Sequence, residues 1–574
     1  MSARAAIVIA LLAAAPAWAS PRRTAASARA LTAADVDRQL AAAWRKAHLS
    51  PGPVTDDATF LRRVTIDLTG TIPTADAVRA FVADKRKDKR ARAVDELLES
   101  PAYARHWATY WDRALMGRLP KMVPVLDHPG FDRWLEDQFA DNRPWNELVR
   151  DLVGKSGVNT DEPAVNWILR YAQQPTDLTG KLSRLFLGVQ IQCAQCHDHP
   201  SEKWKQDDFR SLAACFARTG PVLLDQKQKG QKGAVRKVEL VDQPGPTFGG
   251  PKTPDLRLIA LSPPRALDGT DFSNADNRRA AFTAWLTRPE NPWFARAIVN
   301  RYWAHLVGRG FVEPIDDFRH SNPTVMPELL DALATDFVAH GYDLEHLIRL
   351  ICATRAYQLA VVAGHPGDGD EQLFVHHRMR PLTGEELYNA LSSATNLENA
   401  LMKAGLPNVD QIKQQIQGAF DFLFSTDEEA APPADFAGSI QQALLFLNGR
   451  LINRASAAVP GMTLSGILDF PADDALKIEA LYLRTLSRKP TPAETARWIA
   501  YVDAPREVVA ENKGQARQLM RLGRHEKRSP QKNPIGAIDR AARKLDPSEP
   551  TAKQQAYEDV FWALLNSSEF IFQH

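Results

Sequence analysis

The chain has 574 residues, which at about 150 residues per domain corresponds to roughly three or four folding units. Hydrophobic residues make up 44% and charged residues 24%, a composition that can bury a sizeable core. Lysine and arginine number 71 against 69 aspartates and glutamates, so the net charge of +2 argues against a nucleic-acid-binding protein with a basic surface. Only four cysteines occur, which excludes a disulfide scaffold.

The first residues have the features of a secretory signal peptide. Arg4 precedes an apolar run over residues 5–15, and Ala17 and Ala19 are small residues at the two positions that a signal peptidase reads. We expect cleavage after Ala19, so that residues 1–19 are removed and the protein is exported. The apolar run is shorter than the ~20 residues needed to span a bilayer, and we expect no transmembrane segment after signal removal.

Helical periodicity dominates the rest of the chain and predicts a mostly α fold with two helical domains, at 31–218 and 278–574. Residues 20–30 are expected to be a solvated linker. One helix is predicted from Asp57 to Leu68, and Thr74 is the expected N-cap of the next. A stripe of apolar and aromatic residues at helical spacing is expected to be core: Trp107, Tyr110, Trp111, Ala114 and Leu115.

Two segments interrupt the helical pattern. Residues 219–277 are rich in lysine, glutamine, glycine and proline, and are predicted to be a linker between the two domains. Within them, residues 235–241 alternate between apolar and polar and predict a strand, with 247–248 as its candidate hairpin partner. Residues 505–553 have few apolar residues and are expected to be an exposed or disordered insert.

The segment Cys193-Ala194-Gln195-Cys196-His197 matches the C-x-x-C-H pattern for covalent attachment of c-type haem. Two thiols at this spacing can add across the two vinyl groups of one porphyrin edge, and the following imidazole then reaches the iron as its proximal ligand. A chance match is rare in a chain with four cysteines and 14 histidines. We therefore predict Cys193 and Cys196 as thioether anchors and His197 as the proximal ligand.

Apolar helical faces are predicted on both sides of this motif. The face before the motif consists of Leu178, Leu182, Leu185, Phe186 and Val189. The face after it consists of Phe209, Leu212, Cys215 and Phe216, in a helix that Gly220 is expected to stop. These helices fit either the apolar walls of a porphyrin site or an ordinary core.

The sixth ligand of such a haem is not supplied by the residues that follow the motif. No methionine occurs between Met122 and Met326, and no histidine between His199 and His305, so a self-contained small cytochrome is not expected. His199 is too close to His197 to reach the opposite face of one haem easily. The iron is either five-coordinate or uses a more distant residue, for which the candidates are His106, Met116, Met122, His128, His305, His320 and Met326.

Other interpretations of the motif remain open. Cys193, Cys196, His197 and His199 together could hold a zinc or iron ion, although no second pair of cysteines or histidines exists to complete a structural zinc site. The two cysteines could also be a redox-active dithiol or a plain disulfide. In these cases the protein would be a cell-envelope scaffold or interaction protein in which the cluster serves as a staple.

The two remaining cysteines lie on apolar helical faces. Cys215 shares its face with Leu212 and Phe216, and Cys352 lies on a face with Ile348. We interpret both as small buried hydrophobic residues rather than as partners in a disulfide.

Several segments resemble two known domain families. Residues 187–200, followed by Lys203, Trp204 and Phe209, closely resemble the planctomycete cytochrome-C-like domain, as do 61–63 and 67–70. The segments that resemble its usual partner, a second planctomycete domain of unknown function, are 291–301, 308–314, 317–318, 354–358 and 564–570.

The resemblance implies an exported bacterial protein of the periplasm or cell envelope, with a haem c site at Cys193, Cys196 and His197. It also implies another exported protein of unknown function, encoded nearby, as a partner. It implies no reaction. Carboxylates such as Asp67 and Asp316 are present, but no nucleophile elbow, metalloprotease motif or phosphate loop accompanies them. We assign no catalytic residue, and the question of enzymatic activity stays open.

Overall fold

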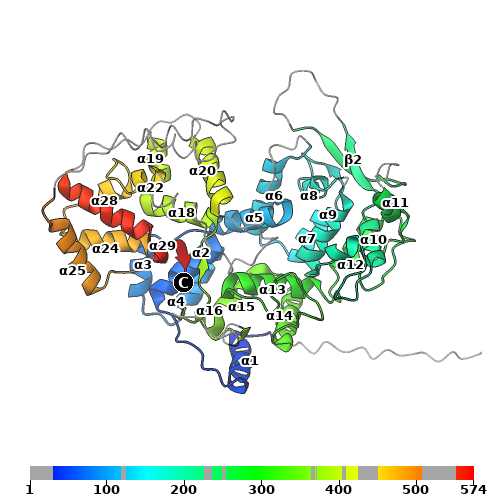
Figure 1. Cartoon of the computed structure of the whole chain (residues 1–574), viewed down its shortest axis with the longest axis horizontal. Helices are drawn as coiled ribbons and strands as arrows, with labels where there is room; N and C mark the ends of the chain where they lie inside the picture. The colour runs from blue at the N-terminus through cyan, green and yellow to red at the C-terminus, as the bar shows by residue number, and fades with distance from the viewer. Residues whose placement is uncertain are drawn as a thin grey trace, which may run out of the picture.

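The computed structural model describes residues 30–117, 125–172, 174–224, 235–247, 254–362, 369, 372–403, 409–424, 450–506 and 551–574. The predicted signal peptide, nearly all of the 20–30 linker, Met122 and most of the 505–553 insert lie outside these residues. Figure 1 shows an elongated arrangement in which blue amino-terminal helices and green helices lie between an outer group of yellow to red helices and an outer group of cyan to green helices.

The fold is mostly α, as predicted. The amino-terminal helices are α1 (Ala33–Lys46), α2 (Asp57–Thr69), α3 (Ala75–Ala83), α4 (Lys89–Leu98), α5 (Pro101–Met116), α6 (His128–Ala140), α7 (Trp145–Gly154), α8 (Val165–Arg170), α9 (Pro175–Leu182) and α10 (Gln206–Ala214). The prediction of a helix from Asp57 is confirmed, and the Thr74 side chain caps α3 by accepting a hydrogen bond from the Ala77 amide.

The later part of the chain is also helical. Its helices are α11 (Pro254–Leu261), α12 (Arg278–Leu286), α13 (Phe294–Val307), α14 (Pro327–Ala339), α15 (Leu344–Ala353), α16 (Arg355–Gln358), α18 (Gly384–Thr395), α19 (Leu397–Lys403), α20 (Val409–Phe424), α22 (Arg450–Ala455), α23 (Thr463–Asp469), α24 (Asp474–Thr485), α25 (Pro492–Asp503), α28 (Ala552–Leu565) and α29 (Ser568–Ile571). None of the described helices is long and apolar enough to cross a membrane.

The predicted hairpin has a different partner strand. Strand β3 (Val238–Asp242) forms near the predicted position, but it lies between β1 (Gly157–Val158) and β2 (Thr219–Leu223), and both pairings are antiparallel. The helix before β2 ends at Ala214, so Gly220 lies within a strand and does not stop the helix. Because β2 is an edge strand, it tolerates the proline that follows Gly220.

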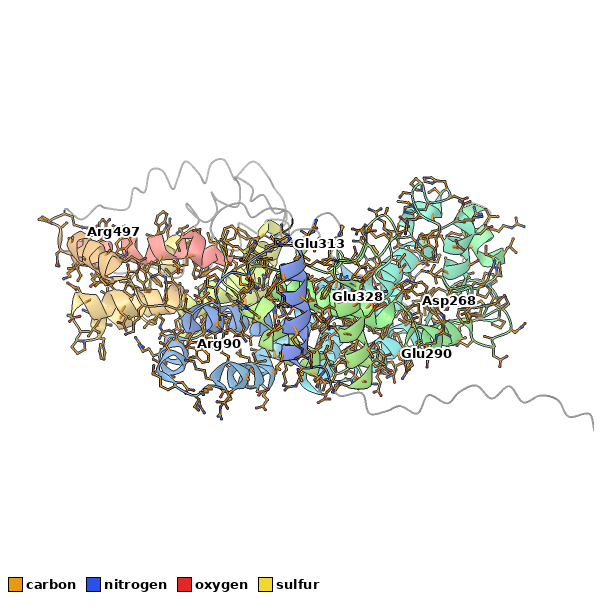
Figure 2. All side chains as sticks on the ribbon, turned by 90° about the horizontal axis from the view of Figure 1, so that it is seen from below. Arg90, Asp268, Glu290, Glu313, Glu328 and Arg497 are labelled. Atoms are coloured by element: carbon orange, nitrogen blue, oxygen red, sulfur yellow. The ribbon has the colours of Figure 1, made fainter. Side chains whose placement is uncertain are left out.

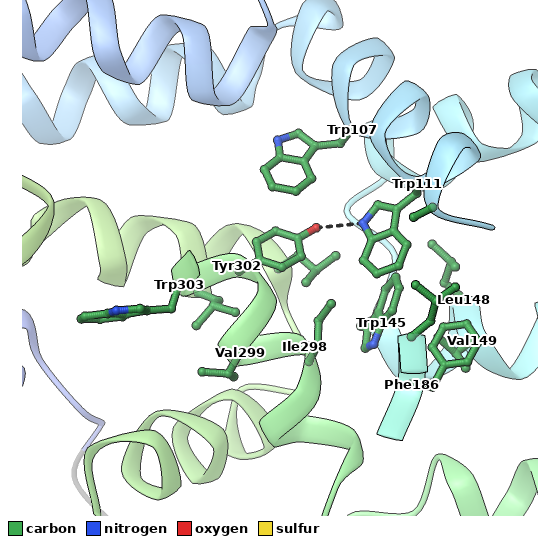
Figure 3. Close-up of a cluster of buried hydrophobic side chains, with 14 of the residues drawn as sticks. Trp107, Trp111, Trp145, Leu148, Val149, Phe186, Ile298, Val299, Tyr302 and Trp303 are labelled. Atoms are coloured by element: carbon green, nitrogen blue, oxygen red, sulfur yellow. Dashed lines mark hydrogen bonds between the residues drawn. The ribbon is translucent and has the colours of Figure 1, made fainter. Parts of the chain in front are cut away.

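Buried side chains form two cores. The larger core combines helices α1 to α10 with α12 to α16, so the helical parts on either side of 219–277 pack against each other. In its centre the rings of Trp107 and Tyr302 stack at 4.5 Å, and the Trp111 indole donates a hydrogen bond to the Tyr302 hydroxyl (Figure 3). The smaller core contains α18 to α28 and meets α2 through Ile66. Charged residues such as Arg497 and Glu290 lie on the outside (Figure 2).

A network of buried charges lies where the two cores meet, and we call it the buried hub. Asp67 is fully buried and accepts hydrogen bonds from Tyr357 (2.9 Å), Arg380 (3.0 Å) and Gln573 (2.5 Å). Arg380 also donates two hydrogen bonds of 2.8 Å to the carboxylate of Glu386. The short strands β4 (Arg380–Pro381) and β5 (Phe572–Gln573) pair here, which brings the carboxyl end of the chain into the middle of the molecule (Figure 1).

Candidate functional site

The segment before the motif is fixed by a contact between the two predicted domains. Helix α9 continues into a π-helical turn, Ser183–Leu187, which ends at Gly188 with φ of +67°. A Cβ atom at Gly188 would lie 2.5 Å from the ring of Phe318, and the Phe318 amide donates to the Gly188 carbonyl at 2.8 Å. Glycine is therefore required here both by its backbone conformation and by the close approach of the second domain.

The motif itself begins in a short 3-10 helix, Gln192–Gln195. Ala194 points into the core and is fully buried, whereas Cys193 and Cys196 are exposed and unpaired. The side-chain amide of Gln206 donates to the Gln195 carbonyl at 3.1 Å, and the backbone amide of Gln206 donates to the Asp198 carboxylate at 3.0 Å. The start of α10 thus holds the motif while both thiols face the solvent.

His197 is exposed and has the hydrogen bond that a metal-binding histidine commonly has. Its Nδ1 donates to the Asp198 carbonyl oxygen at 2.7 Å. This contact leaves the lone pair of Nε2 free to bind an iron atom, and it fixes the orientation of the ring.

His199 has the opposite arrangement. Its Nδ1 accepts a hydrogen bond from the Ser201 amide at 3.3 Å, so its ring proton lies on Nε2. Two exposed thiols and the free Nε2 of His197 fit a haem c site. The four-residue metal cluster fits less well, because His199 presents a proton where a ligand must present a lone pair.

A pocket of about 580 Å³ lies between the loop that follows the motif and a loop of the second domain. We call it the interdomain pocket. The side chains that line it are mainly aromatic or cationic and include Lys203, Trp204, Trp293, Arg296, Phe318 and His320. Lys203 lies over the ring of Trp204 at 4.7 Å. The pocket therefore combines flat apolar walls with positive charge.

Hydrogen bonds across the pocket connect the two loops. Glu202 accepts from the Ser321 hydroxyl at 2.7 Å and from the His320 amide at 3.2 Å. The Ser321 hydroxyl holds the pKa of Glu202 below its usual range, so this carboxylate stays charged near neutral pH.

A further contact between the two predicted domains lies before the motif. Asp316, which is buried, accepts from Arg184 at 2.7 Å and from Gln190 at 2.9 Å. Burial raises the pKa of its neighbour Asp317, although Arg319 at 3.0 Å acts in the opposite direction. The motif is therefore held by contacts to the second domain on both sides in sequence.

Of the candidate sixth ligands, the structure brings only His320 into this pocket among the described residues. His106 is buried and His305 is half-buried, and both lie beside Trp107 in the large core. Burial, with the positive charge of Arg380, lowers the pKa of His305 to about 3. These two histidines belong to the core.

The remaining candidates lie elsewhere. Met116 is fully buried at the end of α5, and His128 binds Asp112 at 2.9 Å at the start of α6. Met326 precedes α14 and packs against the large core. Met122 lies outside the described residues.

The other two cysteines are buried and unpaired, which confirms the prediction that they are core residues. Burial raises the pKa of both Cys215 and Cys352 well above the usual range of a thiol. In the described residues, the groups of three potential ligand atoms within 4.8 Å of one another lie away from the motif: Asp336, His340 and His346, and Asp112, His128 and Asp132.

Comparison with family models gives two matches. Residues 35–220 match PSCyt2, a protein of unknown function (DUF1549), and residues 278–415 match PSD1, a protein of unknown function (DUF1553). Together the matches cover more than half of the chain. The chain is a PSCyt2–PSD1 protein. Among curated proteins and among solved structures, nothing matches this chain.

The interdomain pocket lies between these two domains. The PSCyt2 domain contributes Lys203 and Trp204, and the PSD1 domain contributes Trp293, Phe318 and His320. Sequence reasoning did not single out Glu202, because an isolated glutamate has no local signal of its cross-domain contact. Trp293 lies in the segment that resembles the partner domain, but its place in a pocket depends on tertiary packing.

Proposed function

We propose that this PSCyt2–PSD1 protein is exported, carries one c-type haem on Cys193 and Cys196, and exchanges electrons with another exported protein. The observation that carries the proposal is the geometry of the motif. Both thiols are exposed and unpaired, and the Nδ1 hydrogen bond of His197 leaves Nε2 free for the iron. A bound haem supplies a one-electron ferric–ferrous couple.

The residues of the motif have distinct roles in this proposal. Each cysteine adds its S–H bond across one vinyl C=C bond: the sulfur bonds to one carbon and the hydrogen to the other. No electrons are gained or lost, so both cysteines must be reduced before attachment. His197 binds the iron, and the Asp198 carbonyl keeps its ring oriented. Because the motif is exposed, the haem edge would be accessible to a redox partner.

The test is covalent haem in the exported protein after denaturation. The full chain is produced in a bacterium that attaches haem to C-x-x-C-H motifs, and is analysed by intact mass and by haem peroxidase staining of a denaturing gel. We expect one haem per chain, none in the C193S/C196S double variant, and undiminished haem in the control C215S. A folded, exported protein without covalent haem contradicts the proposal.

The same preparations separate the alternative functions. Stoichiometric zinc or iron in haem-free protein, lost in C193S/C196S, would instead support a structural metal site. A mass two hydrogens lower that is restored by reduction would support a disulfide staple. Amino-terminal sequencing tests export, and we expect the mature chain to begin at Ser20.

A further inference from the structure

We propose that the PSD1 domain completes the haem site, with His320 as the sixth ligand of the iron and Lys203 as a partner of a haem propionate. This inference rests on the proposed haem attachment and goes further, since it assigns the PSD1 domain a role in the cofactor site. It rests on the position of the interdomain pocket, on its lining, and on the way in which His320 is held.

The pocket is lined by Ser201 to Trp204, which belong to the loop that follows the motif. The His199 amide donates to the Trp204 carbonyl at 2.8 Å, which folds the loop after the motif back on itself. His197 is two residues from His199, so the two Cα atoms lie within about 7 Å of each other. The loop that lines the pocket therefore starts close to the predicted proximal ligand, and the proposal places the free part of a porphyrin attached at Cys193 and Cys196 in this pocket.

The walls of the pocket suit a planar macrocycle. Trp204 is almost fully buried, and Trp293 and Phe318 contribute two further rings from the PSD1 domain. Flat aromatic side chains favour stacking with a large conjugated ring and exclude water from it. A volume of about 580 Å³ leaves room for a substantial part of such a ring beside the motif.

His320 is held in position and has a free imidazole. Its amide binds Glu202, and Arg319 and Asn322 on either side form a bridge that closes its turn. Among the described residues, its ring has no hydrogen-bond partner, and the side chain is exposed at the pocket. The loop that follows the proximal ligand thus positions a second imidazole.

The charge of the pocket matches a dicarboxylate ligand. Arg319 pairs with Asp317 and Arg296 pairs with Asp331, each at 3.0 Å. Lys203 has no carboxylate partner among the described residues and lies against Trp204. It is therefore the cation that is available to a propionate.

The sixth ligand is tested by the spectrum of the purified ferric holoprotein. We expect the wild type to be six-coordinate and low-spin. His320→Ala should keep its covalent haem but become high-spin, and added imidazole should restore the low-spin form. His128→Ala is the control, because His128 lies at the start of α6 and does not line the pocket. We expect its spectrum to match the wild type.

Each outcome bears on a different claim. A high-spin wild type, or an unchanged spectrum in His320→Ala, overturns the assignment of His320 but leaves covalent haem attachment intact. Absence of covalent haem in the wild type overturns both. A low-spin form lost in His128→Ala would assign the ligand to His128 instead.

The propionate contact is tested by the reduction potential. Lys203→Gln removes a positive charge beside the haem carboxylates, so the ferric state is favoured and the potential should fall. Lys205→Gln is the matched control: it makes the same change of charge in the same loop, but Lys205 is not among the residues that line the pocket. Equal shifts in the two variants would overturn the role of Lys203.

Discussion

Two regions of the protein contain clusters of ionisable side chains, and the clusters differ in burial and in pairing. In the buried hub, Asp67 is fully enclosed and accepts three hydrogen bonds from side chains. In the motif loop, Cys193, Cys196 and His197 are exposed, and the thiols have no partners. The hub uses its groups to hold the fold together, whereas the loop leaves its groups available for chemistry.

The comparison shows why a shifted pKa alone does not identify a reactive site. Burial raises the pKa of Asp67 to about 6, although Arg380 acts against this. Burial would also raise the pKa of Glu386, but the positive charge of Arg380 and its two hydrogen bonds lower it to about 2. Both shifts follow from enclosure and pairing. The motif loop instead differs from the hub in its exposed thiol and imidazole groups.

The largest expected difference between the two kinds of environment is in thiol reactivity. In haem-free protein, Cys193 and Cys196 should react rapidly with a thiol reagent, whereas Cys215 and Cys352 should react at least about 10³-fold more slowly, because they become accessible only when the structure opens. Timed labelling followed by mass spectrometry measures this. Haem-loaded protein should have no fast thiols. Four fast thiols in native protein would contradict the burial of Cys215 and Cys352.

The next largest effect is expected in the hub. Arg380→Met removes the cation shared by Asp67 and Glu386 and leaves two buried carboxylates without it, which should lower the free energy of unfolding by about 3–5 kcal/mol. Denaturation in urea measures the loss. Arg79→Met is the control, since Arg79 pairs with Asp76 at the surface and its loss should cost at most about 0.5 kcal/mol. Similar losses in both variants would contradict the prediction that the buried Arg380 stabilises the fold more than the exposed Arg79 does.

Gly188→Ala tests the contact that fixes the motif loop. The new methyl group would displace the Phe318 ring, and the alanine would have to adopt a positive φ. Together these effects should lower the free energy of unfolding by about 2–4 kcal/mol. Gly341→Ala is the matched control: its φ is +69°, but nothing lies within 4 Å of a new Cβ, so it should cost about 1–2 kcal/mol. Thermal unfolding of both variants gives the comparison, and equal losses would rule out a tight interdomain contact at Gly188.

The last prediction is a pH dependence of stability, which has almost no effect at neutral pH and grows only on acidification. The folded protein keeps His305 neutral down to about pH 3, whereas the unfolded chain protonates it below about 6.5. This histidine therefore lowers stability as the pH falls from 6.5 to 3, by up to about 1.4 kcal/mol per pH unit. The His305→Phe variant has no titratable group at this position, so it should not lose this part of its stability on acidification. Urea denaturation at several pH values should show the wild type losing stability relative to the variant on acidification, and parallel curves would contradict a neutral His305 in the folded protein.

Features that depend on local spacing were predictable from the sequence. The apolar helical faces placed Cys215 and Cys352 in the core, and the capping residue Thr74 marked the start of α3. The C-x-x-C-H spacing singled out the motif. These inferences succeed because helix periodicity and capping are set by residues a few positions apart.

Features that depend on distant partners were not predictable. Strand β2 contains Gly220 and Pro221, which locally indicate a break, and it forms because β3 supplies a partner. Asp67 and Arg380 are 313 residues apart, so no local pattern signals their pairing. Nothing in the sequence selects His320 from the other candidate ligands, because its position depends on the contact between Glu202 and Ser321.

The late strand β5 sets the order in which the molecule can be completed. Asp67 is synthesised early, yet Gln573, which binds it, follows 506 residues later. The amino-terminal helices can collapse on their apolar faces during synthesis, but the hub closes only after β5 has been made. Loss of residues 572–573 would remove the Gln573 hydrogen bond to Asp67 and the strand pairing beside Arg380, so the hub would open more readily to proteases.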